Sequence, residues 1–539
     1  MRQTKNTEFF YNLSTLIIGN FTGTLISTLG TIIVINFLST EEYGLINLSF
    51  VIPNILIFFG ELGLNYASTN FIVRMKKEND INGIKCIIKI NLFIKIIFGT
   101  ILSLLVFFNA TNISYGIFKK RDERLPILIQ ISSFGIFSII LYEAIISILL
   151  GLEKVTSIRN SIILRKSIDA VLSIFLLFIG FSIYGPLIGF IIAPFIITIM
   201  NMIFLKKEKF FLKNQNKANE YWNIFSKMVK YGYPLSIVSI IIGIQTPIYS
   251  ILFATFSTID SLSFYSVSLV SSQIIIILIQ SLSSTIFPLF SKYDWNDDVE
   301  RNNLVHYFNF SIKIGSIIVN PITIILIIFS EDIFPLIYGS KYIDASIFIS
   351  LNFATYLLVA FGMLSIPAFF SGQKKNKNVL LLELLKLSGG ILFSLLFLRF
   401  LNGIGIMVGI LFGFVLNVII GNLLIIKIYG KKLLFYLKES TLIFLITTLI
   451  GFGFYFIKVL IKTIFMVYSS NLFFIILNFF IISIIYLLST HVLFSLFSLI
   501  SEEDLDLLLK NVEKIPVIRK LIKLMINIDK KIIKLRNRG

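Results

Sequence analysis

The chain alternates between long apolar segments and short charged ones. A helix that crosses a membrane needs about 20 mostly apolar residues. The segments that meet this requirement are 12–38, 44–72, 86–108, 126–150, 162–182, 185–205, 231–256, 261–290, 305–329, 343–370, 379–400, 404–427, 440–460 and 472–499. The pattern predicts an all-α polytopic membrane protein with about fourteen transmembrane helices. The composition agrees, because a chain of 539 residues that is 56% hydrophobic has more apolar surface than a soluble protein of this length can bury.

The positive side chains predict the orientation of these spans. With the N-terminus inside, 27 of the 48 Lys and Arg residues fall at inner segments, eight at outer segments and ten after residue 500, and three (Lys89, Lys95 and Lys313) lie deep in spans. The outer segment 119–124 is net positive, but the other segments outweigh it. The bias predicts a multi-pass protein of the cell membrane with both termini in the cytoplasm. Because this bias accounts for the net charge of +19, we do not expect a nucleic-acid partner.

Short motifs recur along the chain at a nearly constant offset and in the same order. Each copy of the repeat contains six predicted spans, and a lysine-rich inner loop separates the two copies. The pattern predicts two parallel six-helix lobes related by an axis along the membrane normal, with two helices appended. The recurring pairs are Asn91-x-x-x-Lys95 with Asn309-x-x-x-Lys313, Gly151 to Lys154 with Gly372 to Lys375, Lys166 with Lys386, and Gly185-x-x-x-Gly189 with Gly405-x-x-x-Gly409.

The predicted organisation has five parts. It comprises an N-lobe (1–205), a cytoplasmic linker (206–230), a C-lobe (231–430), the appended spans (431–500) and a basic tail (501–539). In the tail, apolar residues recur at helical spacing among lysines and arginines. This pattern favours an amphipathic helix on the anionic lipids of the cytoplasmic leaflet over a solvated tail.

Two lysines occupy matched positions deep in the membrane. Lys95 and Lys313 each lie about ten residues from the inner end of their span, or roughly 15 Å deep. A lysine at this depth costs roughly 2.5–3.5 kcal/mol on insertion scales, so it needs a compensating role. Asn91 and Asn309 lie one turn away on the same helical faces. A cation next to an amide suits phosphate or sugar oxygens, and we predict that these four residues line a substrate cavity.

Other charged residues leave two interpretations open. Arg165, Lys166 and Lys386 lie nearer the inner surface, where they could contact substrate. They could equally form local ion pairs at helix ends, since Asp169 and Glu383 lie within one turn of them.

Two acids near the middle of their spans are similarly ambiguous. Glu61 and Glu143 could couple ion movement to transport. Alternatively, either could be the interhelical partner of Lys95 or of Lys313.

The sequence predicts no catalytic residue, cofactor or metal site. Its single cysteine, Cys86, and its two histidines, His306 and His491, are too few for a metal cluster of these residues. The chain also lacks a phosphate-binding loop of the GxxxxGK[ST] type. We therefore expect a transporter that does not itself hydrolyse ATP.

Five short motifs resemble those of the polysaccharide biosynthesis and oligosaccharide flippases of the MATE-like superfamily. In chain order they are Phe37 to Leu45 (FLSTEEYGL), Gly63 to Ala67 (GLNYA), Lys230 to Leu235 (KYGYPL), Phe287 to Ser291 (FPLFS) and Phe334 to Tyr342 (FPLIYGSKY). The resemblance implies alternating access by two six-helix lobes that carry a polyprenyl-linked oligosaccharide from the inner to the outer leaflet. It also implies glycosyltransferases or a polymerase of the same pathway as partners.

Three alternatives fit the sequence less well. Drug and cation antiporters of this superfamily typically carry an acid in span 1, but 12–38 has none here. The peptidoglycan-precursor flippase usually has arginines in spans 1 and 8, which this chain lacks. A membrane glycosyltransferase or ligase should have a large outer domain, whereas the longest outer segment is only about 109–125.

Overall fold

The computed structural model describes residues 2–208, 218–293, 295, 297–430, 433, 436–464 and 472–499. Within these ranges the chain is almost entirely helical, and none of the described residues forms a β-strand. The helices group into two compact units, Met1–Gln273 with Phe397–Ile406, and Ile274–Leu396 with Met407–Gly539. The tail predicted for 501–539 lies outside the described residues, as does the middle of the predicted linker.

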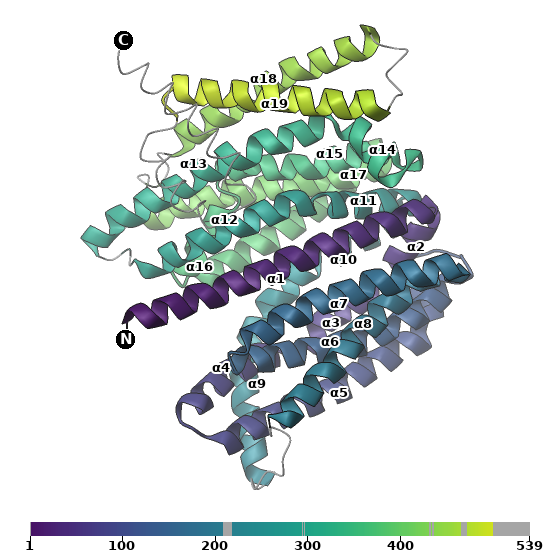
Figure 1. Cartoon of the computed structure of the whole chain (residues 1–539), viewed down its shortest axis with the longest axis vertical. Coiled ribbons are helices and arrows are strands. Elements are labelled where there is room, and N and C mark those ends of the chain that lie inside the picture. Colours follow the sequence, from purple (N-terminus) through teal and green to yellow (C-terminus); the bar gives the residue numbers. More distant parts are fainter. Residues whose placement is uncertain are drawn as a thin grey trace. The chain divides into compact units, whose positions relative to one another are not determined.

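The first unit contains the helices up to α11. Helices α5 to α8 lie side by side in it, and α1 packs along α7 (Figure 1). The elements are α1 (Arg2–Phe37), α2 (Thr40–Ser49), α3 (Val51–Gly60), α4 (Leu64–Lys77), α5 (Ile81–Asn112), η1 (Ile113–Ile117), α6 (Arg124–Gly151), α7 (Val155–Leu176), η2 (Leu177–Phe181), α8 (Tyr184–Lys207), α9 (Ala218–Gly243), α10 (Gln245–Phe256) and α11 (Ile259–Ser271).

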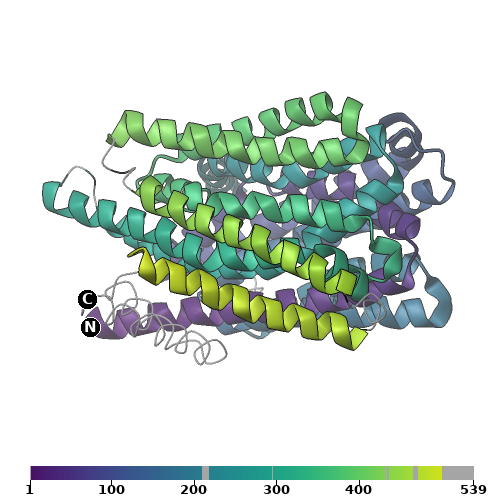
Figure 2. The ribbon, with the colours of Figure 1, turned by 90° about the horizontal axis from the view of Figure 1, so that it is seen from above.

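The second unit contains the remaining helices, except for residues Phe397–Ile406 of α17, and α18 and α19 pack against each other and against α13 (Figure 2). Its elements are α12 (Gln273–Lys292), α13 (Asp298–Ile328), α14 (Ser330–Tyr338), η3 (Ser340–Tyr342), α15 (Ala345–Tyr356), η4 (Leu357–Phe361), α16 (Ser365–Gly372), α17 (Asn376–Tyr429), α18 (Tyr436–Ile464) and α19 (Leu472–Leu496).

The helices confirm an all-α membrane protein. In the described part of the chain, eleven helices are long and apolar enough to cross a membrane, or twelve if the bent pair 345–361 and 365–372 is one span. Helix α7 is not among them, and it carries four charged residues. Helix α17 covers two predicted spans and has a non-helical residue at Asn402. The count of fourteen and the orientation stay predictions.

The internal repeat is visible in the backbone as well as in the sequence. Glu153 (φ 61°) and Lys374 (φ 57°), which occupy matched places in the two copies, both adopt a positive φ that side chains rarely allow. Ser182 (φ 42°, ψ −127°) and Asn402 (φ 49°, ψ −134°) form a second matched pair of this kind. The two copies therefore share unusual local conformations at corresponding positions, as a duplicated fold requires.

The recurring glycines have the same packing role in both copies. A Cβ on Gly189 would meet Ser173, and a Cβ on Gly409 would meet Ser394, which is the counterpart of Ser173 to within one position. Small residues at such positions allow two membrane helices to approach closely. The predicted lobe boundaries stay predictions. In the structure, α9 to α11 group with the first compact unit rather than with the second.

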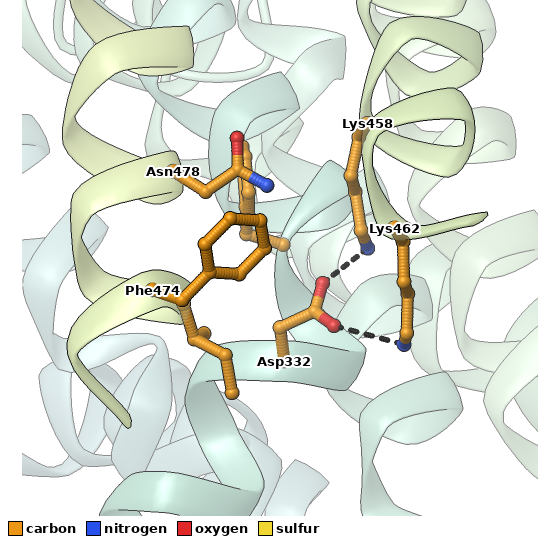
Figure 3. Close-up of a pocket in the computed structure, with 7 residues that line it drawn as sticks. Asp332, Lys458, Lys462, Phe474 and Asn478 are labelled. Atoms are coloured by element: carbon orange, nitrogen blue, oxygen red, sulfur yellow. Dashed lines mark hydrogen bonds and ion pairs between the residues drawn. The ribbon is translucent and has the colours of Figure 1, made fainter. Parts of the chain in front are cut away.

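The appended helices are attached to the rest of their unit by a buried charge cluster. Lys458 of α18 is 4% exposed, pairs with Asp332 of α14, and donates a hydrogen bond to Ile328 O at the end of α13 (2.7 Å). Lys462 reaches the other oxygen of Asp332 at 3.2 Å, while Phe474 and Asn478 of α19 lie opposite (Figure 3). The cavity between them, about 20 Å³, is the size of a single water.

We predict that Asp332→Asn destabilises the second unit by about 3–5 kcal/mol, because it leaves the Lys458 ammonium buried without a countercharge. Thermal unfolding in lipid nanodiscs would measure the loss. The double variant Asp332→Asn/Lys458→Met should recover much of it, and the exposed neighbour Glu331→Gln should have little effect. Equal stability of Asp332→Asn and the wild type would contradict this assignment.

Candidate functional site

The second membrane span is broken near its middle. Helix α3 ends at Gly60 and α4 begins at Leu64, and between them Leu62 (φ 49°) and Gly63 (φ 69°) adopt left-handed conformations. A break of this kind leaves carbonyl groups at the end of α3 without helical partners. In a membrane such groups must be satisfied by other protein groups, since lipid offers no donor.

Lys95 of α5 donates to the carbonyl groups at this break, of which Glu61 O also accepts from the Leu64 N–H at 2.9 Å. Its Nζ donates hydrogen bonds to Gly60 O at 3.0 Å and to Glu61 O at 2.8 Å. The Lys95 side chain is completely buried. The matched lysine of the first repeat therefore holds a discontinuous helix together, in addition to any contact that it makes with substrate.

The two mid-span acids lie near the same ammonium. Glu61 and Glu143 both interact electrostatically with Lys95, and Glu143 also interacts with Arg165. The Arg165 guanidinium lies over the Tyr142 ring, 4.7 Å from its centre. The hydrogen bonds of the ammonium go to backbone carbonyls, and its interhelical partnership with these acids stays a prediction.

The paired asparagines lie one turn from their lysines, and Asn309 is only partly buried. Asn91 is fully buried, and its Nδ2 is 3.4 Å from Ser147 Oγ on α6. The Oδ1 atoms of Asn91 and Asn309 have no hydrogen-bond partner among the described residues. Both asparagines therefore offer an acceptor one turn from a lysine.

Lys313 has an acidic partner that its own helix does not supply. Its Nζ lies 3.2 Å from Glu439 Oε2, where Glu439 stands in the first turn of the appended helix α18. The Lys313 side chain is 15% exposed and the Glu439 side chain is 51% exposed. The sequence analysis missed this partner, because the two residues are far apart in the chain and nothing in the local spacing connects them.

The cations nearer the predicted inner surface are also balanced. Lys386 pairs with Glu383 at 2.6 Å, which confirms the local ion pair expected from their spacing. Lys166 lies 3.4 Å from Ser27 Oγ of α1, and Asp169 interacts electrostatically with Lys166 and Arg165. These cations can be neutralised by neighbouring acids and still bind substrate, since an anionic substrate can replace the acid as their partner.

The candidate residues form a separate group in each compact unit. In the first unit, contacts or electrostatic interactions connect Glu61, Lys95, Glu143 and Arg165, and Asn91 is one turn from Lys95. In the second unit, Lys313 and Asn309 share a face of α13, while Lys386 lies on α17. Within the described ranges, no group of three or more His, Cys, Asp or Glu side chains is arranged to hold a metal ion.

We predict that Lys95→Met destabilises the first unit by about 3–5 kcal/mol, since it removes two hydrogen bonds and the cation between Glu61 and Glu143. Thermal unfolding of the purified protein is the measurement. Lys89→Met on the same helix is the matched control and should unfold near the wild-type temperature. Similar behaviour of the two variants would argue against a structural role for Lys95.

The fold is that of known membrane transporters. The chain is similar to a structure described as the lipid II flippase MurJ in an inward closed conformation (TM-score 0.68, 18% identity, 88% of this chain and 98% of that one). It is also similar to an inward-facing multidrug resistance MATE family transporter of the MOP superfamily (0.60, 16%, 74% and 93%). A MOP superfamily transporter from Pyrococcus furiosus, described as having a binding pocket of reverse polarity, is a third neighbour (0.54, 16%, 79% and 96%).

Sequence comparison identifies the family. No curated protein sequence matches this chain significantly. A family model described as polysaccharide biosynthesis protein matches residues 33–347, which is more than half of the chain and contains all five motifs noted in the sequence. The chain therefore belongs to the polysaccharide biosynthesis protein family.

Proposed function

We propose that this protein carries a polyprenyl phosphate- or pyrophosphate-linked oligosaccharide from the inner to the outer leaflet by alternating access. The match to the polysaccharide biosynthesis family over residues 33–347, on a transporter fold, is the observation that carries the proposal. The internal repeat supports it, because parallel repeats commonly build transporters with a site at their interface.

The charges indicate how an anionic linkage could be held. The Lys313–Glu439 pair is partly exposed, and such pairs contribute about 0–1 kcal/mol, so a phosphate can replace Glu439 at little cost. Asn309, one turn away, has an Oδ1 without a hydrogen-bond partner among the described residues, and this atom can accept a hydrogen bond from a sugar hydroxyl. Lys313 with Asn309 is therefore our first choice for the substrate contact.

The other candidate residues differ in how accessible they are to substrate. Arg165, Lys166 and Lys386 are only partly buried and can contact the phosphate or the sugar. Lys95 and Asn91 are completely buried, so they would reach substrate only if α3 and α4 rearranged. Glu61 and Glu143 fit best as charge partners of Lys95, and coupling to an ion is a secondary role for them.

The expected partners follow from the same proposal. Glycosyltransferases or a polymerase of the same pathway would supply and consume the lipid-linked glycan. The basic segment 501–539 would bind anionic lipids of the cytoplasmic leaflet. The protein would act as a transporter in the cell membrane rather than as an enzyme.

We predict that proteoliposomes containing the purified protein move a polyprenyl-pyrophosphate oligosaccharide across the bilayer. A glycosidase that cannot cross the membrane measures the fraction of glycan exposed on each side. Empty liposomes and the bare polyprenyl phosphate are the controls. Efflux of a cationic dye without glycan movement would support the antiporter alternative. Glycosyl transfer in detergent would support the enzyme alternative.

A second prediction separates substrate binding from simple ion pairing at Lys313. Lys313→Gln should reduce glycan movement at least tenfold, which corresponds to about 1.4 kcal/mol, because it removes the cation that meets the phosphate. Glu439→Gln should leave movement near the wild-type rate, because it frees the same cation. If the two variants were equally impaired, the pair would be structural and Lys313 would not be a substrate contact.

A further inference from the structure

Helix α9, which begins the second sequence repeat, packs directly on the broken second span. A Cβ placed on Gly63 would lie 2.8 Å from Gly232 Cα, and one placed on Gly232 would lie 3.1 Å from Gly63 Cα. Real Cβ atoms essentially never approach other atoms more closely than 3.0 Å, so the two backbones touch. Both positions belong to motifs that carry the family resemblance, GLNYA and KYGYPL.

Side chains on both sides of the glycine pair complete the contact. Tyr66 Oη and Ser239 Oγ are hydrogen-bonded at 2.9 Å, and the Phe71 and Tyr231 rings meet edge to face at 5.9 Å. Further along, Phe58 occupies the space that a side chain at Gly243 would need. We call this set the α4–α9 seam, and it consists of Phe58, Gly63, Tyr66, Phe71, Tyr231, Gly232, Ser239 and Gly243.

The position of the seam relates it to Lys95. Gly63 is the residue before α4, immediately after the carbonyls that Lys95 holds. The basic end of α4 at Arg74 lies ten residues beyond Leu64, or roughly 15 Å along the helix. Apart from Phe58 and Gly243, the seam therefore lies between the buried Lys95 and the predicted cytoplasmic end of α4.

The same part of the chain is also attached at its other end. Lys120, in the loop after η1, donates a hydrogen bond from Nζ to Ser257 O at 3.0 Å. Gly44 of α2 contacts Ile259, which begins α11. The segment from α9 to α11 thus contacts the first repeat at both ends.

We propose that the α4–α9 seam is a gate on the cytoplasmic side, which must separate and re-form in each transport cycle. The proposal rests on the flippase function, because it assigns the closing contact of that activity. The physical reason is that glycine at both positions permits a backbone contact that needs little side-chain ordering to form. A Cβ at either position would keep the seam from closing without removing any group that binds substrate.

Cross-linking across the seam tests the proposal. In a Cys86→Ala background, Tyr66→Cys and Ser239→Cys would be joined by a short bis-methanethiosulfonate reagent in proteoliposomes. Glycan movement should fall to the level of empty liposomes and return on reduction. The control pair is Thr69→Cys with Ser147→Cys, whose parent residues also contact (Thr69 Oγ1 to Ser147 O, 3.0 Å) but lie within the first repeat. Cross-linking the control pair should leave movement unchanged.

Glycine substitution provides a second test. Gly232→Ala should reduce movement about tenfold or more, because the added methyl group clashes with Gly63. In a Cys86→Ala/Ser239→Cys background, it should also increase labelling of the introduced thiol by an impermeant reagent applied from the side of the 206–230 linker. Gly116→Ala, where a Cβ meets nothing within 4 Å, is the matched control.

The outcomes separate this inference from the proposed function. Full movement by the cross-linked seam, with the parent active, would overturn the gate and leave the flippase intact. If the parent moves no lipid-linked glycan, the flippase proposal fails, and thiol labelling of the Ser239→Cys variant still reports on the seam. Labelling that Gly232→Ala leaves unchanged would also overturn the gate.

Discussion

The structure depends on satisfying backbone carbonyls where membrane helices break. At the α3–α4 break the donor is Lys95, at the end of α13 it is Lys458, and at the end of η4 it is Asn422, whose Nδ2 is 3.0 Å from Phe361 O. In each case the donor comes from a different helix. Lipid can replace none of these bonds, so at these three places a neighbouring helix supplies the polar side chain that the carbonyl needs.

This requirement changes the meaning of the buried lysines. When a lysine lies within a span and no acid is near it on the same helix, the sequence suggests an anion-binding site. Here the carbonyls of Gly60 and Glu61 compensate Lys95, and Glu439 compensates Lys313. The two positions match in the repeat but differ in availability, because a carbonyl-bound, fully buried ammonium is harder to free than a partly exposed ion pair. Duplication has preserved the residue type while the local environment has diverged.

Helix α9 belongs to the second copy of the repeat but packs on helices of the first. Its sequence belongs to the second copy, yet Met228 is completely buried in a core with residues of α4, α5 and α6. Helices that belong to one copy and pack on the other are the natural places for a transporter to open and close. In α9 that packing is a backbone contact between two glycines, which demands little side-chain repacking when it separates or forms.

The sequence by itself determined the all-α membrane architecture and the family, because apolar length and short motifs are local properties. It also located the Lys386–Glu383 pair, since residues three apart on a helix are neighbours. It could not identify Glu439 as the partner of Lys313, the carbonyl partners of Lys95 or the Gly63–Gly232 contact. Those depend on which helices pack together and where a span breaks. Only the tertiary structure decides these, because electrostatic and steric interactions act through space between residues that are far apart in the chain.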